Sequence, residues 1–330
     1  MDNLTHSLVG ALIGQAGLKR KTGLAMPALI IGANLPDVDA ACFFWLDGVE
    51  HLGFRRGIKH GPIAWVLLPL VLAGLLYGFD RWQAGRGKRP ADRLPVSFKW
   101  LYLLSFIACL THPALDWLNV YGIRLLEPFS SRWFYGDTLF IIDIWLWALL
   151  GFATWFSLRR EKRGREWRRP ARVAIAVALA YVGMNGAITA AAERDGDEHL
   201  DVADLIASPV PLAFWERELI WHAADADPEN ARPVWGNWRF PEGVASGLSS
   251  SDKIVFIEHG GTPAMTAEEI ATKNSAMAAF LFWSRAPFVE CDDSGQVLLR
   301  DARFYDPRAR DRFSVALPDV RCEPVPLSSP

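Results

Sequence analysis

The sequence predicts a helical polytopic membrane domain of about six apolar helices, several broken by proline, followed by a small α+β soluble domain. Six apolar runs follow one another in residues 1–192, and the charge reverses after them. Residues 1–192 carry 22 lysines and arginines against 13 aspartates and glutamates, whereas residues 193–330 carry 13 against 24. Such asymmetry indicates two environments. The basic half is also the apolar half, so lipid headgroups rather than nucleic acid are its expected partner.

The apolar runs have the lengths of membrane spans. The first has 15 residues, and the other five have 18 to 23, near the roughly 20 that cross a hydrocarbon core. A single run of this kind could be a buried helix of a soluble protein, but six in series argue against that interpretation. No cleavable signal peptide is evident at the start, so the first run is expected to be retained. The runs are 4–18, 24–46, 62–79, 98–118, 139–158 and 171–192.

Lysine and arginine concentrate in alternate loops, which predicts an orientation. Seventeen lie in the loops at 19–21, 81–99 and 159–172, and five lie in the loops on the other side. Because positively charged loops stay cytoplasmic, the N-terminus and everything after residue 192 are predicted to be extracytoplasmic. The sequence therefore predicts a membrane domain over 1–192 and an extracytoplasmic acidic domain over 193–330.

Histidines and aspartates beside prolines or glycines gather at the predicted outer leaflet. Ionisable groups at membrane depth are costly and mark functional sites, and histidine with aspartate suits a divalent metal. The alternative is that the prolines mark ordinary kinks and the polar residues are structural. We expect Asn34 and Asp143 to orient a histidine ligand. The predicted metal ligands are His6, Asp37, Asp39, His60, His112 and Asp116.

Six candidate ligands exceed the four of a simple zinc site. The surplus indicates either two ions, or one ion with a carboxylate base. Zinc is the expected ion, with Mn²⁺ or Mg²⁺ as alternatives. Either arrangement can activate a water for attack, and Asp37, Asp39 and Asp116 are the candidate catalytic carboxylates.

A few basic residues stand on the outer side, beside these candidate ligands. Arginine suits bidentate binding of phosphate or carboxylate. Arg56, Lys59 and Arg124 are therefore candidates for binding an anionic substrate group. The alternative is that they only anchor the chain to lipid headgroups.

Three functions fit these observations. The first is a membrane-bound metal-dependent hydrolase, in which a metal-activated water attacks a phosphoester or another amphiphilic substrate, a membrane lipid or lipid-linked molecule, at the outer leaflet. The second is a non-enzymatic transporter or sensor of divalent cations. No aspartate or glutamate occurs in the inner half of any predicted span, which counts against a permeation path. The third is a membrane-anchored interaction protein whose acidic domain carries the function.

Four short motifs surround His6, the pair Asp37 and Asp39, His60, and His112 with Asp116. Together these motifs resemble the YdjM-like family of bacterial inner-membrane proteins assigned as metal-dependent hydrolases. The resemblance covers about residues 1–160. It implies a multi-pass protein of the bacterial inner membrane with a divalent metal and hydrolase activity, and by position it suggests the same six ligands. Arg55 and Lys59 stand where the family pattern has His and Thr, so one polar contact to the site differs here. The motifs are Thr5-His6-Ser7, Leu35-Pro36-Asp37-Val38-Asp39, Arg56-Gly57-x-x-His60 and His112-Pro113-x-x-Asp116.

Residues 193–330 predict the small α+β domain, without a motif that points to a chemistry. The capping box Thr266-Ala267-Glu268-Glu269 opens a helix expected to reach about Trp283. Cys291 and Cys322 are expected either to pair in a disulfide or to remain two separate thiols. The expected strands are 254–257, 297–304 and 313–317.

Overall fold

The structure is a computed structural model of the whole chain. It describes all residues except 201, 224–232, 245–274, 292–295, 306–309 and 322–330. The chain forms two compact units. Unit 1 comprises Met1–Asp39, Arg56–Ala187 and Pro211–Phe214, and unit 2 comprises Ala40–Arg55, Ile188–Val210 and Trp215–Pro330.

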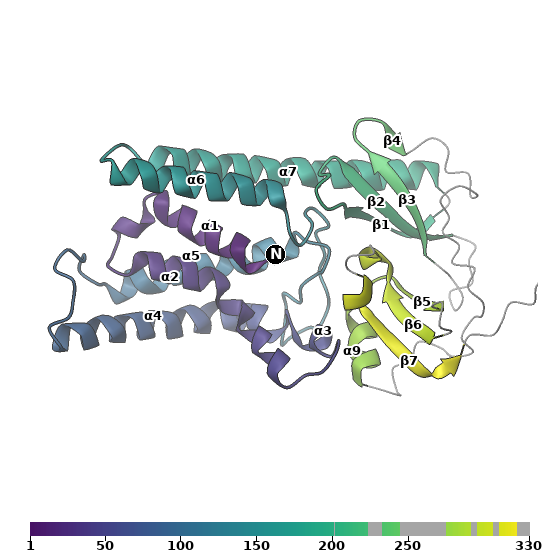
Figure 1. Cartoon of the computed structure of the whole chain (residues 1–330), viewed down its shortest axis with the longest axis horizontal. Helices are drawn as coiled ribbons and strands as arrows, with labels where there is room; N and C mark the ends of the chain where they lie inside the picture. The colour runs from purple at the N-terminus through teal and green to yellow at the C-terminus, as the bar shows by residue number, and fades with distance from the viewer. Residues whose placement is uncertain (201, 224–232, 245–274, 292–295, 306–309, 322–330) are drawn as a thin grey trace, which may run out of the picture. The chain divides into compact units, whose positions relative to one another are not determined.

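Unit 1 is a bundle of helices (Figure 1). Helix α2 packs against α1 and α5, α4 packs against α5, and α1 also packs against α6. Short 3₁₀ segments connect some of them. The helices are α1 (Asn3–Gln15), α2 (Ala25–Asn34), α4 (Pro62–Gly85), α5 (Phe98–Trp117), α6 (Ile144–Lys162) and the first part of α7 (Arg168–His199), with 3₁₀ segments η1 (Leu18–Arg20), η2 (Leu35–Phe44) and η3 (Ile58–His60).

The helix starts follow ordinary capping chemistry. The Asp2 carboxylate accepts from the N–H groups of Leu4 and Thr5 at 2.9 and 3.0 Å, which satisfies donors that the first turn of α1 leaves open. Asp143 caps α6 in the same way, accepting from Leu146 N–H at 2.8 Å. Pro62 stands at the first position of α4, where its missing N–H costs nothing. These caps fix where α1, α4 and α6 begin.

Small and leucine side chains fill two cores of unit 1. One core joins α2, α4 and α5 through buried residues such as Ala28, Leu29 and Leu104. The other joins α1, α6 and α7 through residues such as Leu12, Leu150 and Ala174. Small residues let helices approach closely, as membrane helices do when van der Waals packing drives their association.

Four helices in the described part of the chain are long and apolar enough to cross a membrane, by length and composition. Around α4 the large apolar side chains face outward, including Val71 and Leu75 at 60% and 67% exposure. Such a surface suits lipid rather than water. The four are Ala25–Phe44, Pro62–Gly85, Phe98–Trp117 and Arg168–His199.

The predicted count of about six spans is not confirmed. Helix α1 has only 13 residues, about 20 Å at 1.5 Å per residue, which is shorter than the hydrocarbon core. Helix α6 ends in Arg159, Arg160, Glu161 and Lys162, so its apolar part is also short. The membrane helices themselves, and a small second domain containing sheets, are confirmed.

Proline breaks the helices less than the sequence predicts. At Leu35, just before Pro36, the α-helix changes into the 3₁₀ segment η2. Pro113 lies inside α5, which continues on both sides of it. A helical proline removes one hydrogen bond, and here the turns on both sides keep the helix intact. His112 and Asp116 consequently stay on one helical face.

Unit 2 contains two antiparallel sheets and the short helices α3 (His51–Phe54) and α9 (Ser275–Trp283), which contact each other. One sheet has the order β1-β2-β3-β4 and the other β5-β6-β7. The rings of Trp283, Phe304 and Phe313 stack in its core at 4.3 to 5.4 Å between centroids. The strands are β1 (Val202–Pro209), β2 (Glu216–Ala223), β3 (Val234–Arg239), β4 (Gly243–Val244), β5 (Pro287–Cys291), β6 (Gln296–Asp301) and β7 (Ser314–Arg321).

Some strands of this half have other bounds than the sequence predicts. The predicted strand 297–304 is β6 followed by the 3₁₀ turn η4 (Ala302–Phe304), because Asp301 caps that turn by accepting from Arg303 N–H at 2.9 Å. The predicted strand 313–317 falls within a longer β7. The predicted strand 254–257, the capping box at Thr266 and the thiol of Cys322 lie outside the described residues. The pairing of Cys291 with Cys322 therefore stays a prediction.

Candidate metal centre

Four side chains from three segments of unit 1 converge at one end of the helical bundle. Asp37 comes from η2, His60 from η3, and His112 and Asp116 from the last turns of α5. Each offers one ligand atom, and these four atoms all lie within 4.8 Å of one another. Three of the four side chains are fully buried, and Asp37 is 7% exposed.

The distances between these atoms suit a shared cation. His60 Nε2 lies 3.9 Å from Asp37 Oδ1 and 3.6 Å from Asp116 Oδ2. His112 Nε2 lies 3.7 and 3.6 Å from the same two oxygens. Zinc bonds to nitrogen and oxygen of about 2.0–2.2 Å put tetrahedral ligand atoms about 3.3–3.6 Å apart. Two imidazole nitrogens with two carboxylate oxygens are therefore a donor set that fits Zn²⁺, and Mn²⁺ as well.

Several atoms of the cluster are buried without a hydrogen-bond partner among the described residues. They are both ring nitrogens of His60, Nε2 of His112 and Oδ2 of Asp116, the last of which forms an ion pair with Arg56. A buried polar atom left unsatisfied costs about 1–3 kcal/mol, so four of them side by side need an explanation. A cation bound between them would satisfy three of these atoms at once, leaving only Nδ1 of His60.

Each histidine of the cluster is held from behind. His112 Nδ1 lies 2.7 Å from the carbonyl oxygen of Ala33. Because a carbonyl only accepts, His112 carries its proton on Nδ1 and turns the lone pair of Nε2 toward the cluster. His60 Nδ1 lies 3.4 Å from Asp39 Oδ2, a charged contact on the corresponding side of the ring that lacks hydrogen-bond geometry. Histidine ligands of metals have this second partner almost always.

His6 lies beside the four residues rather than among them. Its Nε2 is 3.4 Å from Asp116 Oδ1, and its ring stacks on that of His112 with centroids 3.8 Å apart. The amino group of Met1 donates to the same Asp116 oxygen. The structure thus brings all six predicted ligands together. Four of them, Asp37, His60, His112 and Asp116, face one point, and Asp39 and His6 lie next to them.

Comparison with known proteins agrees with the motifs of this site. The model of the YdjM inner membrane protein family matches residues 1–192, more than half of the chain. This chain belongs to the YdjM inner membrane protein family. The resemblance predicted from the motifs is therefore confirmed, and with it an inner-membrane location. All six candidate ligands lie within the part that matches the YdjM family.

A relative from Bacillus subtilis (strain 168), "Uncharacterized protein YfhP", is 27% identical over 167 residues. The match covers 48% of this chain and 47% of the relative, so the chain spans about half the length of the curated relative it matches. No solved structure matches this YdjM-family chain.

The two arginines that the sequence assigns to substrate are engaged by carboxylates within the YdjM-family domain. Arg56 Nε lies 3.1 Å from Asp116 Oδ2. Arg124 Nη1 donates to Glu127 Oε1 at 2.9 Å. Lys59 is half-buried and directly precedes His60. Both arginines near the site thus pair with carboxylates of the protein itself.

The pKa of His60 is compatible with metal binding at this candidate site of the YdjM-family domain. His60 lies in η3, between the candidate spans. Burial is the largest of the causes that place the pKa of His60 well below its usual value. A lowered pKa keeps the imidazole neutral at pH 7, which is the form that binds metals.

Sequence reasoning missed several groups that hold the site in the YdjM-family domain. The Ala33 carbonyl and the Asn119 side chain, which accepts from Arg56 Nη1 at 3.0 Å, are two of them. A backbone carbonyl cannot be recognised from the sequence. The only sequence feature of Asn119 is its position three residues after Asp116, which does not identify a partner. The predicted histidine partners have other contacts: Asn34 donates to Ser7 Oγ at 3.0 Å, and Asp143 accepts from Tyr181 at 2.9 Å.

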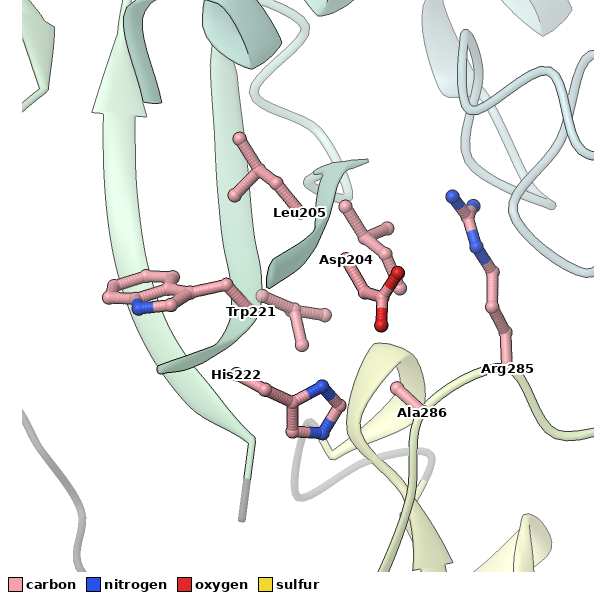
Figure 2. Close-up of a pocket in the computed structure, with 8 residues that line it drawn as sticks. Asp204, Leu205, Trp221, His222, Arg285 and Ala286 are labelled. Carbon is pink, nitrogen blue, oxygen red and sulfur yellow. The ribbon is translucent and has the colours of Figure 1, made fainter. Parts of the chain in front are cut away.

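Unit 2 has a cavity of about 450 Å³ lined by residues of β1, β2 and the segment before β5. Figure 2 shows Asp204, His222 and Arg285 around it, with Leu205, Trp221 and Ala286. Asp204 and Arg285 are exposed and His222 is half-buried. The residues that line this cavity therefore lack the buried polar groups that fix a ligand. The cluster of His and Asp side chains in the YdjM-family domain is the stronger candidate site.

Proposed function

We propose that this chain is a membrane-embedded hydrolase that depends on a divalent metal. The observation that supports the proposal is the convergence of His60 Nε2, His112 Nε2 and two carboxylate oxygens in a buried position. The Ala33 carbonyl bonds Nδ1 of His112, and the Asp39 carboxylate lies 3.4 Å from Nδ1 of His60. Donor sets of this kind hold the ions of metal-dependent hydrolases.

The residues of the cluster have distinct roles in this proposal. Asp37, His60, His112 and Asp116 would hold the ion, and Asp39 and His6 would keep His60 and Asp116 in place. When bound there, a divalent ion supplies Lewis acidity, which lowers the pKa of a water and polarises an ester. Asp37, Asp39 and Asp116 remain the candidate catalytic carboxylates, and zinc the first candidate ion, with Mn²⁺ or Mg²⁺ as alternatives.

An amphiphilic substrate fits the surroundings of the site. His60, His112 and Asp116 stand at or next to the ends of candidate spans, and Asp37 lies within the span Ala25–Phe44. A molecule dissolved in the bilayer could present its polar group there. Asp37 is the least buried of the carboxylates, with 7% of its side chain exposed against 1% and 2% for Asp116 and Asp39. We therefore propose that the substrate reaches the site from the side of Asp37. Lys59 beside His60 is the candidate group for the anion of a phosphoester. The substrate class is accordingly a membrane lipid or a lipid-linked molecule.

The experiment is turnover by purified protein. The full chain in detergent is stripped of metal, reloaded with Zn²⁺ or Mn²⁺, and assayed with phospholipids and generic phosphoesters. Asp37→Ala and His112→Ala are expected to lower turnover by at least about 100-fold, because each removes a ligand. His51→Ala is the matched control, since His51 is a half-buried histidine bonded to the carbonyl of Gly48.

The outcome separates this function from its alternatives. Metal bound without turnover of any ester would contradict hydrolysis. Ion flux in proteoliposomes under the same conditions would then favour a transporter of divalent cations. Full biological activity from residues 193–330 on an unrelated membrane anchor would instead favour an interaction protein.

A further inference from the structure

Arg56 contacts two of the carboxylates of the site from opposite ends of the residue. Its backbone N–H donates to Asp39 Oδ2 at 2.9 Å, and its Nε lies 3.1 Å from Asp116 Oδ2. The side chain is buried, with 7% of its surface exposed. Arg56 therefore lies between the carboxylate that supports His60 and a carboxylate that faces the cluster.

The guanidinium of Arg56 is fixed in this position. Nη1 donates to Asn119 Oδ1 and to the carbonyl of Gly122, both at 3.0 Å. The guanidinium also lies over the Tyr121 ring, 4.3 Å from its centroid. The backbone of Arg56 has a φ of 55°, a left-handed conformation that costs an ordinary residue about 1–2 kcal/mol. These contacts hold a strained residue, so its cation is a permanent part of the site.

The charges of the side chains balance with one divalent ion. Asp37, Asp39 and Asp116 carry three negative charges on side chains that are 7%, 2% and 1% exposed, and Arg56 carries one positive charge beside them. Arg124 and Glu127 pair with each other and add no net charge. Two negative charges remain on these side chains for an ion to neutralise, and the Met1 amino group also contacts Asp116. A buried net charge is costly whichever its sign.

The position of Arg56 also bears on a second ion. Two-metal sites hold their ions about 3.5–4 Å apart, and a carboxylate that bridges them uses both of its sides. Asp116 faces the two histidines through Oδ2, and the other contacts of that oxygen include Arg56 Nε. The remaining oxygen, Oδ1, faces His6 and the Met1 amino group. The Arg56 guanidinium thus contacts the oxygen of Asp116 that faces the two histidines, and the Met1 amino group contacts the other oxygen.

We propose, on the basis of the metal site proposed above, that the site holds one divalent cation and that Arg56 supplies its second positive group. Arg56 is a positioning residue in this view, because it orients Asp39 and Asp116 and limits the number of ions. This decides between the one-ion and two-ion arrangements that the six candidate ligands allow.

The test is the number of ions bound per chain. Full-length protein in detergent is titrated with Mn²⁺ after removal of metal, bound ions are counted by elemental analysis, and electron paramagnetic resonance distinguishes an isolated Mn²⁺ from a coupled pair. The variants are Arg56→Gln, which removes the charge, and Arg56→Lys, which keeps it. Arg132→Gln is the control, because Arg132 is an exposed arginine of the following loop.

We expect one isolated ion per chain in the wild type, in Arg56→Lys and in Arg132→Gln. Arg56→Gln should take up a second equivalent at high Mn²⁺ and give the spectrum of a coupled pair. Two ions in the wild type, or one ion in Arg56→Gln, would overturn the inference while the metal site stands. The wild-type count decides the first point even if Arg56→Gln does not fold. No bound ion in any protein would overturn the metal site and this inference together.

Discussion

Nδ1 of His60 lies 3.4 Å from Oδ2 of Asp39, while Nε2 of the same ring faces Asp37 and Asp116. Asp39 is also bonded by the backbone N–H of Arg56 at 2.9 Å. This hydrogen bond holds the Asp39 carboxylate in place beside the imidazole of His60. This pair sets the direction in which His60 presents its lone pair.

The first prediction concerns Asp39→Asn. We expect the affinity for Zn²⁺ to fall by about 10- to 100-fold, because outer partners of histidine ligands have effects of that size. Competition with a chromogenic chelator measures the affinity. Asp92→Asn, at an exposed position between α4 and α5, should leave it unchanged. An affinity equal to that of the wild type in Asp39→Asn would show that His60 needs no support from Asp39.

The second prediction distinguishes histidines of the site from histidines elsewhere. His112→Ala should reduce bound metal to near zero, because it removes a ligand and the contact to the Ala33 carbonyl. His51→Ala should keep the full content, since His51 packs on Phe43, with ring centroids 4.8 Å apart, in unit 2. Elemental analysis of the two variants purified side by side gives the answer. Equal metal loss in both would point to general unfolding instead of loss of a ligand.

The convergence of the six polar residues was predictable from the sequence. Which of them face the common point and which lie behind a histidine was not. Lysine and arginine counts set the order of the loops, and this alone gathered His6, His60 and His112 at one end of the spans. Whether a carboxylate faces the ion or stands behind a histidine depends on rotamers and on the path of η2. Asp37 and Asp39 are two residues apart, yet one faces the cluster and the other faces Nδ1 of His60.

The number of spans and the strands of unit 2 were harder to predict. An apolar run shows where a helix lies but not how much of that helix is apolar enough to cross the membrane. Helix α6 is an example, because its last turn contains Arg159 and Lys162. Strands β1 to β4 went unpredicted because their short apolar stretches lie between turns and have no strong alternation. Arg217 even lies fully buried in β2, bonded through Nε to Thr189 Oγ1 at 2.9 Å.

The third prediction concerns the loop that carries His60. A Cβ on Gly61 would overlap the backbone oxygen of Glu127, so Gly61→Ala should destabilise the protein by about 1–3 kcal/mol or more. Gly78, in the middle of α4, has no atom near its Cβ position. Gly78→Ala should be neutral or slightly stabilising, since alanine favours a helix by about 1 kcal/mol over glycine. Thermal unfolding in detergent compares them, and a melting temperature for Gly61→Ala at or above that of Gly78→Ala would refute the close packing.

The fourth prediction concerns a buried ion pair of unit 2. Burial raises the pKa of Asp301, but Arg303 at 2.8 Å and hydrogen bonds from Ser284 and Arg303 outweigh it and hold that pKa below its usual value. Because the folded pKa is depressed, the pair stabilises the fold above the ordinary pKa of about 3.8 and stops doing so as the pH falls below it. Asp301→Asn should cost about 3–5 kcal/mol at pH 7.

Asp311→Asn is the matched control for that prediction. Its carboxylate pairs with Arg300 at 3.3 Å but is 79% exposed, and exposed pairs contribute about 0–1 kcal/mol. Near-UV circular dichroism of full-length protein follows the melting of unit 2 between pH 7 and pH 3. A wild-type midpoint that already falls between pH 7 and pH 5 would have another cause than Asp301. Equal losses in the two variants would contradict the role of burial.

X-ray absorption of the zinc-loaded full chain tests the central claim most directly. Asp37, His60, His112 and Asp116 predict a first shell of nitrogen and oxygen only, at about 2.0–2.1 Å, with outer-shell scattering from two imidazoles. Sulfur at about 2.3 Å, or an absence of imidazole scattering, would contradict the site.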